Sequence, residues 1–123
     1  MIKKKILLAE DNLINQKVAL LMLKKFDQNI ELADNGLIAV EKFKSEHYDV
    51  VLMDLHMPEL DGFEATRKIR EIENSEQRPV KVKIYAMTAS SMQDEKDNCL
   101  NAGMDGYLAK PFRNDDVIAL LAG

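Results

Sequence analysis

Acidic side chains, one hydroxyl and one lysine directly follow the apolar runs of this chain. At the ends of these runs stand Glu10, Asp11, Asp34, Asp54, Thr88 and Lys110. If the runs are parallel strands of one sheet, their carboxyl ends lie along one edge, where the ligand sites of open parallel sheets form. These residues are therefore the first candidates for chemistry.

Three of the candidates are carboxylates that we expect to lie close together, because Glu10, Asp11 and Asp54 end neighbouring central strands. Two like charges about 4 Å apart cost about 4 kcal/mol at an effective dielectric constant of about 20. Lys110 compensates one of these charges. A divalent cation with oxygen ligands compensates the rest, and Mg²⁺ is the usual ion where water and phosphate complete an octahedron.

A carboxylate beside a lysine and a bound cation can attack phosphorus. In this interpretation Asp54 is the nucleophile and forms an aspartyl phosphate, while the metal and Lys110 neutralise the charge of the transition state. The Thr88 hydroxyl donates a hydrogen bond to a phosphoryl oxygen. Each position alone is more often a helix cap, a turn hydroxyl or a solvated charge, so the prediction depends on their conjunction.

Other residues of reactive type carry less weight. His47 and His56 stand apart and are interpreted as solvated or packed side chains rather than metal ligands. Tyr107, taken alone, is interpreted as a half-buried or surface aromatic. Cys99 is the single cysteine, so it forms no internal disulfide, and we expect a small packed side chain.

Strands and helices that alternate along the chain must position the candidate residues. Apolar runs predict strands at 3–9, 30–33, 48–54, from 80 to an end at 87–89, and 104–109. Helices are expected at 13–26, 37–46, from a cap at 61 through 72, at 90–102, and from 114 to a stop at 123. Parallel strands need helical crossovers, so the fold class is α/β with a doubly wound, five-stranded parallel sheet.

Two of the expected helices have apolar patterns that make specific predictions. In the helix at 13–26 the residues expected to face the sheet recur at three- and four-residue spacing: Ile14, Val18, Leu21, Met22 and Phe26. The helix at 90–102 has few expected inward anchors, namely Met92, Cys99 and Leu100. We therefore expect the second of these helices to dock weakly.

The composition fits one domain over 1–123, with 46% apolar residues and a formal net charge of −4. This acidic balance disfavours direct nucleic-acid or anionic-membrane binding and favours a cation or a basic partner surface. No apolar run approaches the roughly 20 residues of a membrane span, and the N-terminal sequence does not read as a signal peptide. We expect a cytoplasmic location.

Four motifs together resemble the receiver domain of two-component response regulators. They are AEDN at 9–12, VVLMDLHMPELDG at 50–62, YAMTA at 85–89 and GYLAKPF at 106–112. The match covers nearly the whole chain in order and spacing. Single-domain chemotaxis-type regulators share the pattern, and EDNxxNQ with CLNAGMDGYLAKPF is similar to the receivers of hybrid histidine kinases.

The resemblance implies a role for each motif residue. It implies a (βα)5 flavodoxin-like fold with strand order 2-1-3-4-5 and Asp54 as phosphoacceptor. Mg²⁺ would be held by Glu10, Asp11, Asp54 and the backbone carbonyl of His56, and Lys110 would pair with the phosphoryl oxygens. Thr88 and Tyr107 would be a switch pair that reshapes the face of the fourth helix, fifth strand and fifth helix.

Further features of the family set more local expectations. The peptide bond between Lys110 and Pro111 is expected to be cis. Glu10 stands where the family often has Asp, and its extra methylene lets the metal contact pass through water. His56 and Ser90 occupy places that influence how fast the acyl phosphate hydrolyses.

The resemblance also implies partners. The phosphoryl donor would be a histidine kinase or a histidine phosphotransfer protein, and the domain would catalyse its own phosphotransfer and dephosphorylation without an external substrate. The response would pass to a downstream protein or to an effector domain absent from this chain, with the receiver a monomer or weak dimer.

Two alternatives remain open from the sequence. A receiver that no longer cycles phosphate would serve as a docking module, although Asp54, Thr88 and Lys110 are all present. A flavodoxin-like cofactor binder or an aspartate-nucleophile phosphatase is disfavoured. The first needs a Ser/Thr/Gly-rich loop where 10–12 reads EDN, and the second needs an Asp where His56 stands.

Overall fold

The sheet has five parallel strands in the order β2-β1-β3-β4-β5, as the motifs predicted. The computed structural model describes residues 3–88, 96–110 and 113–122. The strands are β1 (Lys5–Ala9), β2 (Asn29–Ala33), β3 (Val50–Asp54), β4 (Lys83–Thr88) and β5 (Gly106–Ala109). After β1 the chain adds β2 on one side, and it then adds β3, β4 and β5 on the other side. The carboxyl ends of β1 and β3 therefore form the topological switch point.

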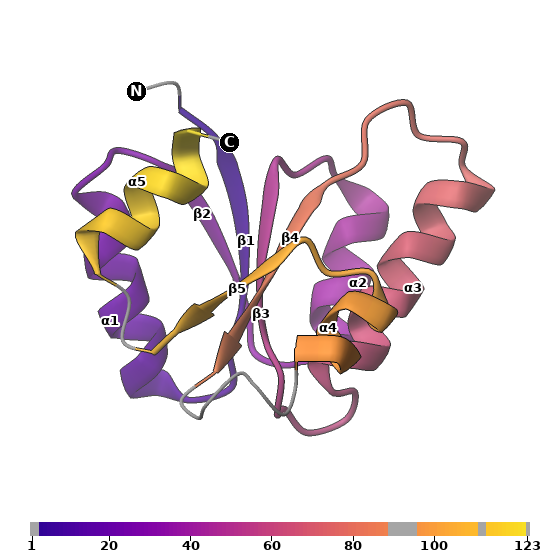
Figure 1. Ribbon diagram of the computed structural model, residues 1–123, viewed down its shortest axis with the longest axis horizontal. Coiled ribbons are helices and arrows are strands. Elements are labelled where there is room, and N and C mark those ends of the chain that lie inside the picture. The colour runs from indigo at the N-terminus through magenta and orange to yellow at the C-terminus, as the bar shows by residue number, and fades with distance from the viewer. Residues whose placement is uncertain (1–2, 89–95, 111–112, 123) are drawn as a thin grey trace.

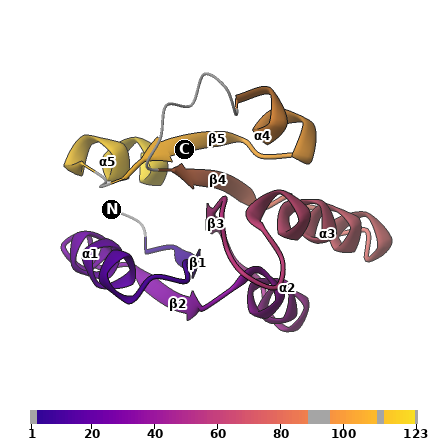
Figure 2. The same cartoon turned by 90° about the horizontal axis from the view of Figure 1, so that it is seen from below.

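Helices cover both faces of the sheet (Figures 1 and 2). They are α1 (Leu13–Lys24), α2 (Gly36–Ser45), α3 (Gly62–Ser75), α4 (Lys96–Ala102) and α5 (Asn114–Ala122). Figure 2 shows α1 and α5 on one face and α2, α3 and α4 on the other. The arrangement confirms the doubly wound α/β fold predicted from the alternation of strands and helices.

Two apolar cores flank the central strands, because successive strand residues point to opposite faces. Leu7 and Val51 pack with α2 and α3, whereas Ile6 and Leu8 pack with α1 and α5. All five residues of β3 are buried. The carboxyl end of β3, which carries Asp54, is therefore fixed between two packed layers.

Polar caps start three of the helices at the edge where the strands end. The side chain of Asn12 accepts a hydrogen bond from Asn15 N at 3.0 Å, and that of Asp61 accepts one from Glu64 N at 2.9 Å. Asn35 does the same for α2 through Ile38 N. The caps at 12 and 61 confirm the sequence prediction.

The face that α1 turns to the sheet differs from the prediction. The buried residues are Gln16, Ala19 and Leu23, and of the predicted residues Met22 and Phe26 pack against the core. Ile14, Val18 and Leu21 are instead exposed, Ile14 at 72% and Leu21 at 68%. The physical reason is Gln16, whose buried amide donates hydrogen bonds to backbone and side-chain oxygens beside the sheet. With Gln16 anchored at the sheet, the part of the predicted stripe formed by Ile14, Val18 and Leu21 lies toward solvent.

Smaller differences concern β4 and α4. Strand β4 begins at Lys83, and Val80 is exposed before it. In α4 Cys99 is buried, as predicted, but Leu100 is exposed and does not anchor the helix. The predicted start of this helix at Ser90, its anchor Met92 and the cis bond to Pro111 lie outside the described residues. Among the described helices, none is both long enough and apolar enough to cross a membrane.

Candidate functional site

Three carboxylates meet at the carboxyl ends of β1 and β3. One oxygen from each of Glu10, Asp11 and Asp54 lies within 4.8 Å of the other two. Glu10 and Asp54 are buried, while Asp11 is exposed. The structure therefore brings together the acidic residues that the sequence predicted as one site.

Lys110 enters this cluster from the carboxyl end of β5. Its ammonium nitrogen lies 2.6 Å from Glu10 Oε1 and 3.3 Å from Asp54 Oδ1. Its backbone N–H donates to the carbonyl oxygen of Thr88 at 2.8 Å, which continues the ladder between β4 and β5. The lysine is thus placed by the sheet itself.

The two buried carboxyl groups have opposite protonation tendencies. Burial, with Glu10 beside it, raises the pKa of Asp54 to about 6. Burial also works against ionised Glu10, but hydrogen bonds from Lys110, Asp54 and the backbone of Asn12 outweigh it and lower the pKa of Glu10. Glu10 is therefore the carboxyl group that ionises first, and the ionised form of Asp54 is the one that gains most from a bound cation.

The spacing of the carboxylates fits a small hard cation. Mg²⁺ prefers oxygen ligands at about 2.0–2.1 Å in an octahedron, so its ligand oxygens lie roughly 3 to 4 Å apart. Oxygens within 4.8 Å of one another meet this requirement with small side-chain adjustments. The cluster at Glu10, Asp11 and Asp54 can accordingly hold Mg²⁺.

A tight loop over residues 55–61 carries the chain from β3 to α3 and depends on two glycines. A Cβ atom at Gly62 would overlap the carbonyl oxygen of Asp54, and one at Gly36 would overlap that of Leu60. Gly62 N–H donates to Leu55 O at 3.0 Å, and His56 N–H approaches Asp54 Oδ1 at 3.4 Å. Close backbone packing therefore fixes the loop beside Asp54.

Sequence reasoning did not find Gln16, which supports the acidic pair from α1. Its amide nitrogen donates to the Glu10 carbonyl oxygen at 2.6 Å and to Asp34 Oδ1 at 3.1 Å. Asp34 ends β2, so Gln16 joins the ends of two neighbouring strands. The available signal was its position as the last residue of the EDNxxNQ motif at 10–16, because the predicted apolar face of α1 did not include it.

The remaining predicted residues occupy different parts of this edge. Thr88 is buried at the end of β4, one residue beyond Met87, which pairs in register with Asp54. Tyr107 lies on β5 with 46% of its surface exposed, and His56 is exposed in the loop after Asp54. Thr88 is thus next to the site, whereas the Tyr107 side chain is accessible to solvent.

The parallel sheet and its edge together define a class of α/β protein with an acidic, cation-binding site at the switch point. Comparison with known proteins narrows this class. The family profile described as response regulator receiver domain matches residues 6–122. The chain therefore belongs to the response regulator receiver domain family of two-component and phosphorelay signalling.

Similar curated proteins are histidine kinases much longer than this chain. It is 46% identical over 121 residues to hybrid signal transduction histidine kinase B of Dictyostelium discoideum, covering 93% of this chain and 6% of that protein. It is 37% identical over 131 residues to histidine kinase 3 of Arabidopsis thaliana, covering 93% of this chain and 13% of that protein. The chain thus corresponds to a small part of these relatives.

Solved receiver domains have the same architecture. One belongs to a sensor histidine kinase of Pseudomonas aeruginosa and has a magnesium ion coordinated in its active-site cleft. It is 42% identical to this chain with a TM-score of 0.84, and the match covers 98% of this chain and 95% of that one. Another is the receiver of Saccharomyces cerevisiae Ssk1, crystallised with the histidine phosphotransfer protein Ypd1; the identity is 33%, the TM-score 0.90, and coverage 98% and 87%. Mg²⁺ is thus the cation found in a similar site.

Proposed function

We propose that this domain is a phosphorylation switch in which Asp54 accepts a phosphoryl group from a phosphohistidine of a partner protein. The observation that carries the proposal is the position of Asp54, buried at the end of β3 with the Lys110 ammonium 3.3 Å from its Oδ1. A single carboxylate beside a fixed cationic group is suited to nucleophilic attack on phosphorus.

In the transfer, an Asp54 carboxylate oxygen forms a bond to phosphorus while the bond from phosphorus to the donor imidazole nitrogen breaks. The bonding pair stays on that nitrogen, which then takes a proton. Lys110 Nζ lies close enough to Asp54 to pair with a phosphoryl oxygen. The backbone N–H of His56 points to the same carboxylate and stabilises its orientation.

The proposed metal ligands are Glu10, Asp11, Asp54 and the backbone carbonyl of His56. Mg²⁺ bound there supplies positive charge that stabilises the transferring phosphoryl group. Glu10 already pairs with Lys110 at 2.6 Å, and its longer side chain suits a contact through water. Asp11 is exposed and is therefore the ligand most accessible from solvent.

Thr88 and Tyr107 form the proposed switch pair. Thr88 ends β4, next to the strand that carries Asp54, so its hydroxyl is suited to donate a hydrogen bond to a phosphoryl group on Asp54. Tyr107 pairs in register with Ala86 and is 46% exposed, so its ring has an outward position from which it can turn inward. The face formed by α4, β5 and α5 would change with this rotation.

The exposed apolar side of α1 is the proposed docking surface for the phosphohistidine protein. It consists of Leu13, Ile14, Val18 and Leu21, all exposed. Helix α1 begins two residues after Asp11, so a partner seated on it reaches the site edge. The crystallised complex of a similar receiver with a histidine phosphotransfer protein supports a partner of this kind.

We infer that residues 1–123 form one receiver unit, located in the cytoplasm, that catalyses its own phosphorylation and dephosphorylation. A histidine kinase or histidine phosphotransfer protein would be the donor. The altered face would act on a downstream protein or on another domain of a longer chain. Neither step requires direct contact with nucleic acid or membrane.

The test is incubation of the domain with acetyl phosphate and Mg²⁺, followed by intact-mass measurement. We expect the mass of one phosphoryl group to appear in the native chain, to vanish in Asp54→Asn and to require Mg²⁺. Beryllofluoride with Mg²⁺ should shift the amide resonances of Thr88 and Tyr107. An unmodified native chain, or full modification of Asp54→Asn, would contradict the proposal.

A further inference from the structure

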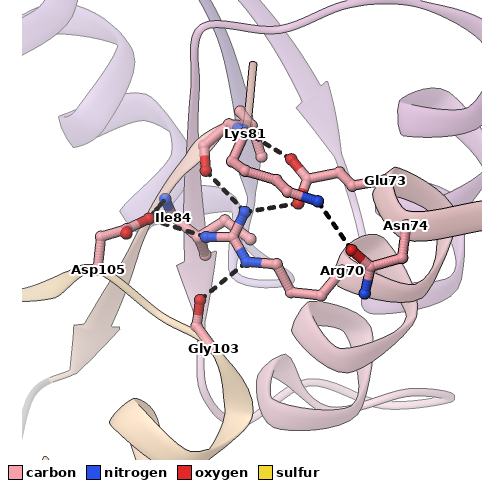
Figure 3. Close-up of polar contacts among 8 residues, drawn as sticks. Arg70, Glu73, Asn74, Lys81, Ile84, Gly103 and Asp105 are labelled. Atoms are coloured by element: carbon pink, nitrogen blue, oxygen red, sulfur yellow. Dashed lines mark hydrogen bonds and ion pairs between the residues drawn. The ribbon is translucent and has the colours of Figure 1, made fainter. Parts of the chain in front are cut away.

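Arg70 of α3 lies beside the residues that precede β4 and β5, whereas Asp54 lies at the carboxyl end of β3. The Arg70 side chain joins three elements (Figure 3). Its Nε donates to Gly103 O at 2.9 Å and one terminal nitrogen donates to Val82 O at 2.8 Å. The other terminal nitrogen donates to Asp105 Oδ2 at 2.8 Å. The guanidinium thus connects α3 to the approach to β4 and to the turn between α4 and β5.

The partners of Arg70 are themselves bound to β4. Asp105 Oδ2 also accepts from Ile84 N at 2.8 Å, and Asp105 N donates back to Ile84 O at 2.7 Å. Glu73, whose side chain is 0% exposed, accepts from Arg70 at 2.7 Å and from Val82 N at 2.7 Å. Arg70 is therefore the shared cation between two carboxylates that fix the start of β4.

The end of α4 is part of the same assembly. Gly103 ends this helix with φ +101°, and the bonds Gly103 N to Leu100 O and Met104 N to Cys99 O close a Schellman turn. The Arg70 stem packs against Gly103 so closely that a Cβ there would lie 3.0 Å from Arg70 Cγ. Arg70 thus anchors the carboxyl end of α4 as well as the entry to β5.

Strand β5 is the shortest described strand and is held by side chains at both of its ends. It is a four-residue strand at the edge of the sheet, and within the described part of the chain it pairs only with β4. Asp105 immediately precedes β5 and forms an ion pair with Arg70. Lys110 immediately follows β5 and forms an ion pair with Glu10, so an ion pair holds each end of the strand. At about 3.3 Å per residue, these two anchors lie roughly 16 Å apart along one strand.

We propose that Arg70 is a positioning residue that fixes β5 against β4 and thereby places Lys110 at Asp54. This inference rests on the proposed function for its effect on phosphorylation, but its structural part stands alone. Without the guanidinium, Glu73 is left buried without its cation and Asp105 loses the contact that ties it to α3. The edge strand then opens more often and Lys110 spends less time in place.

The test compares Arg70→Met with Arg78→Met as a matched control. Arg78 is a similarly covered arginine, with its guanidinium 4.4 Å from the Phe43 ring centroid and a 2.7 Å ion pair to Glu76. Its side chain donates to Phe43 O of α2, so it belongs to the side of the molecule away from β5. Both variants lose one partly buried guanidinium, but only one loses the β5 anchor.

Amide hydrogen exchange is the first measurement. In Arg70→Met we expect peptides covering 104–110 to exchange at least about tenfold faster relative to peptides covering β3, whereas Arg78→Met changes both equally. Arg70→Lys, which keeps one ion pair but not the forked contact, should give an intermediate result and serves if Arg70→Met does not fold. Equal behaviour of β5 in the two Met variants would overturn the proposal.

The second measurement separates positioning from general stability. With acetyl phosphate and Mg²⁺, Arg70→Met should slow phosphorylation of Asp54 about threefold or more, and this loss should shrink toward zero in a Lys110→Ala background. An undiminished loss in that background would show that Arg70 does not act through Lys110. If the native chain is not phosphorylated, the proposed function fails, and the exchange measurement still decides whether Arg70 anchors β5.

Discussion

The ammonium group of Lys110 lies 2.6 Å from the carboxylate of Glu10, although Lys110 follows β5 and Glu10 follows β1. This pair spans the carboxyl edge of the sheet above Asp54. The same ammonium group lies farther from Asp54, at 3.3 Å. Lys110 therefore offsets the negative charge of Glu10 more than that of an ionised Asp54. The balance of charge at this edge leads to the first two predictions.

Asp54→Asn should stabilise the metal-free protein at neutral pH. Burial beside Glu10 raises the pKa of Asp54 from 3.8 to about 6, so the folded chain binds more protons than the unfolded chain between these values. The free energy of unfolding therefore falls as pH rises through this window and stays lower above it. We expect Asn to recover about 1 to 2 kcal/mol at pH 7.5, after allowance for solvent screening.

Urea denaturation in the presence of a chelator measures this gain. It should be present at pH 7.5 and nearly vanish by about pH 3, below the pKa of Asp54 in both the folded and the unfolded state. Glu71→Gln, which removes one negative charge from an exposed side chain on α3, controls for net charge. A gain that is equal at both pH values would show that the raised pKa of Asp54 is not its cause.

Mg²⁺ should stabilise the native chain and have much less effect on Glu10→Gln. Ligand binding to the folded state adds about 2.7 kcal/mol to the free energy of unfolding when the ion is at about 100 times its dissociation constant. Loss of one carboxylate from the cluster should weaken Mg²⁺ binding about tenfold or more. Isothermal titration with MgCl₂ at pH 7.5 gives the affinity, with Glu71→Gln on α3 as the control.

A Mg²⁺ affinity unchanged by Glu10→Gln would contradict the proposed ligand set. The same titration on Asp54→Asn should also show a loss. If both variants bind normally while Glu71→Gln binds weakly, the cation is held elsewhere.

Gly62→Ala should be strongly destabilising although glycine to alanine in a helix is usually favourable. The new Cβ would overlap the Asp54 carbonyl oxygen, which is backbone and has no flexible end to move. We expect a loss of about 2 to 4 kcal/mol, in the range of other disruptive core changes. Gly106→Ala is the control, because its Cβ would meet the Tyr85 ring at 3.1 Å, which small shifts relieve. Equal losses measured by urea denaturation would contradict this account of the loop.

The site was more predictable from the sequence than the packing around it. Parallel strands bring the positions at their carboxyl ends to one edge whatever the details of packing. The predicted site residues are all of this kind, at the last residue of a strand or just after it: Glu10, Asp11, Asp54, Thr88 and Lys110. The clean apolar run before Asp54 made β3 easy to place. The strand order and the acidic cluster therefore follow from local patterns and the family motifs.

The contacts that the sequence did not predict are those made by long polar side chains. Gln16 reads as a surface residue, yet it is buried. The predicted inward face of α1 was wrong at Ile14, Val18 and Leu21, which are exposed, and was confirmed at Met22 and Phe26, which pack against the core. Arg70 and Glu73 have the spacing of an ordinary helix pair, and nothing local indicates that Asp105 completes it. Hydrogen-bond partners distant in sequence decide these positions, and periodicity does not report them.

The exposed side of α1 gives the last prediction. Ile14→Gln with Leu21→Gln should leave the free energy of unfolding within about 0.5 kcal/mol, because both side chains are already in solvent. By contrast, Leu23→Ala on the buried side should cost about 2 to 5 kcal/mol. Phosphorylation by acetyl phosphate should be unchanged in the double variant, since this small donor needs no docking surface.

Transfer from a phosphorylated histidine phosphotransfer protein should be at least about tenfold slower in that double variant, since a few buried anchors carry most of the binding energy of an interface. Single-turnover transfer followed by intact mass measures the rate. Gln substitutions at the exposed Leu100 and Ile118, on α4 and α5, are the matched control and should not slow it. A slower transfer in the control variant and a normal rate in the α1 variant would place the donor on the α4–α5 side, so the two surfaces are distinguished by one experiment.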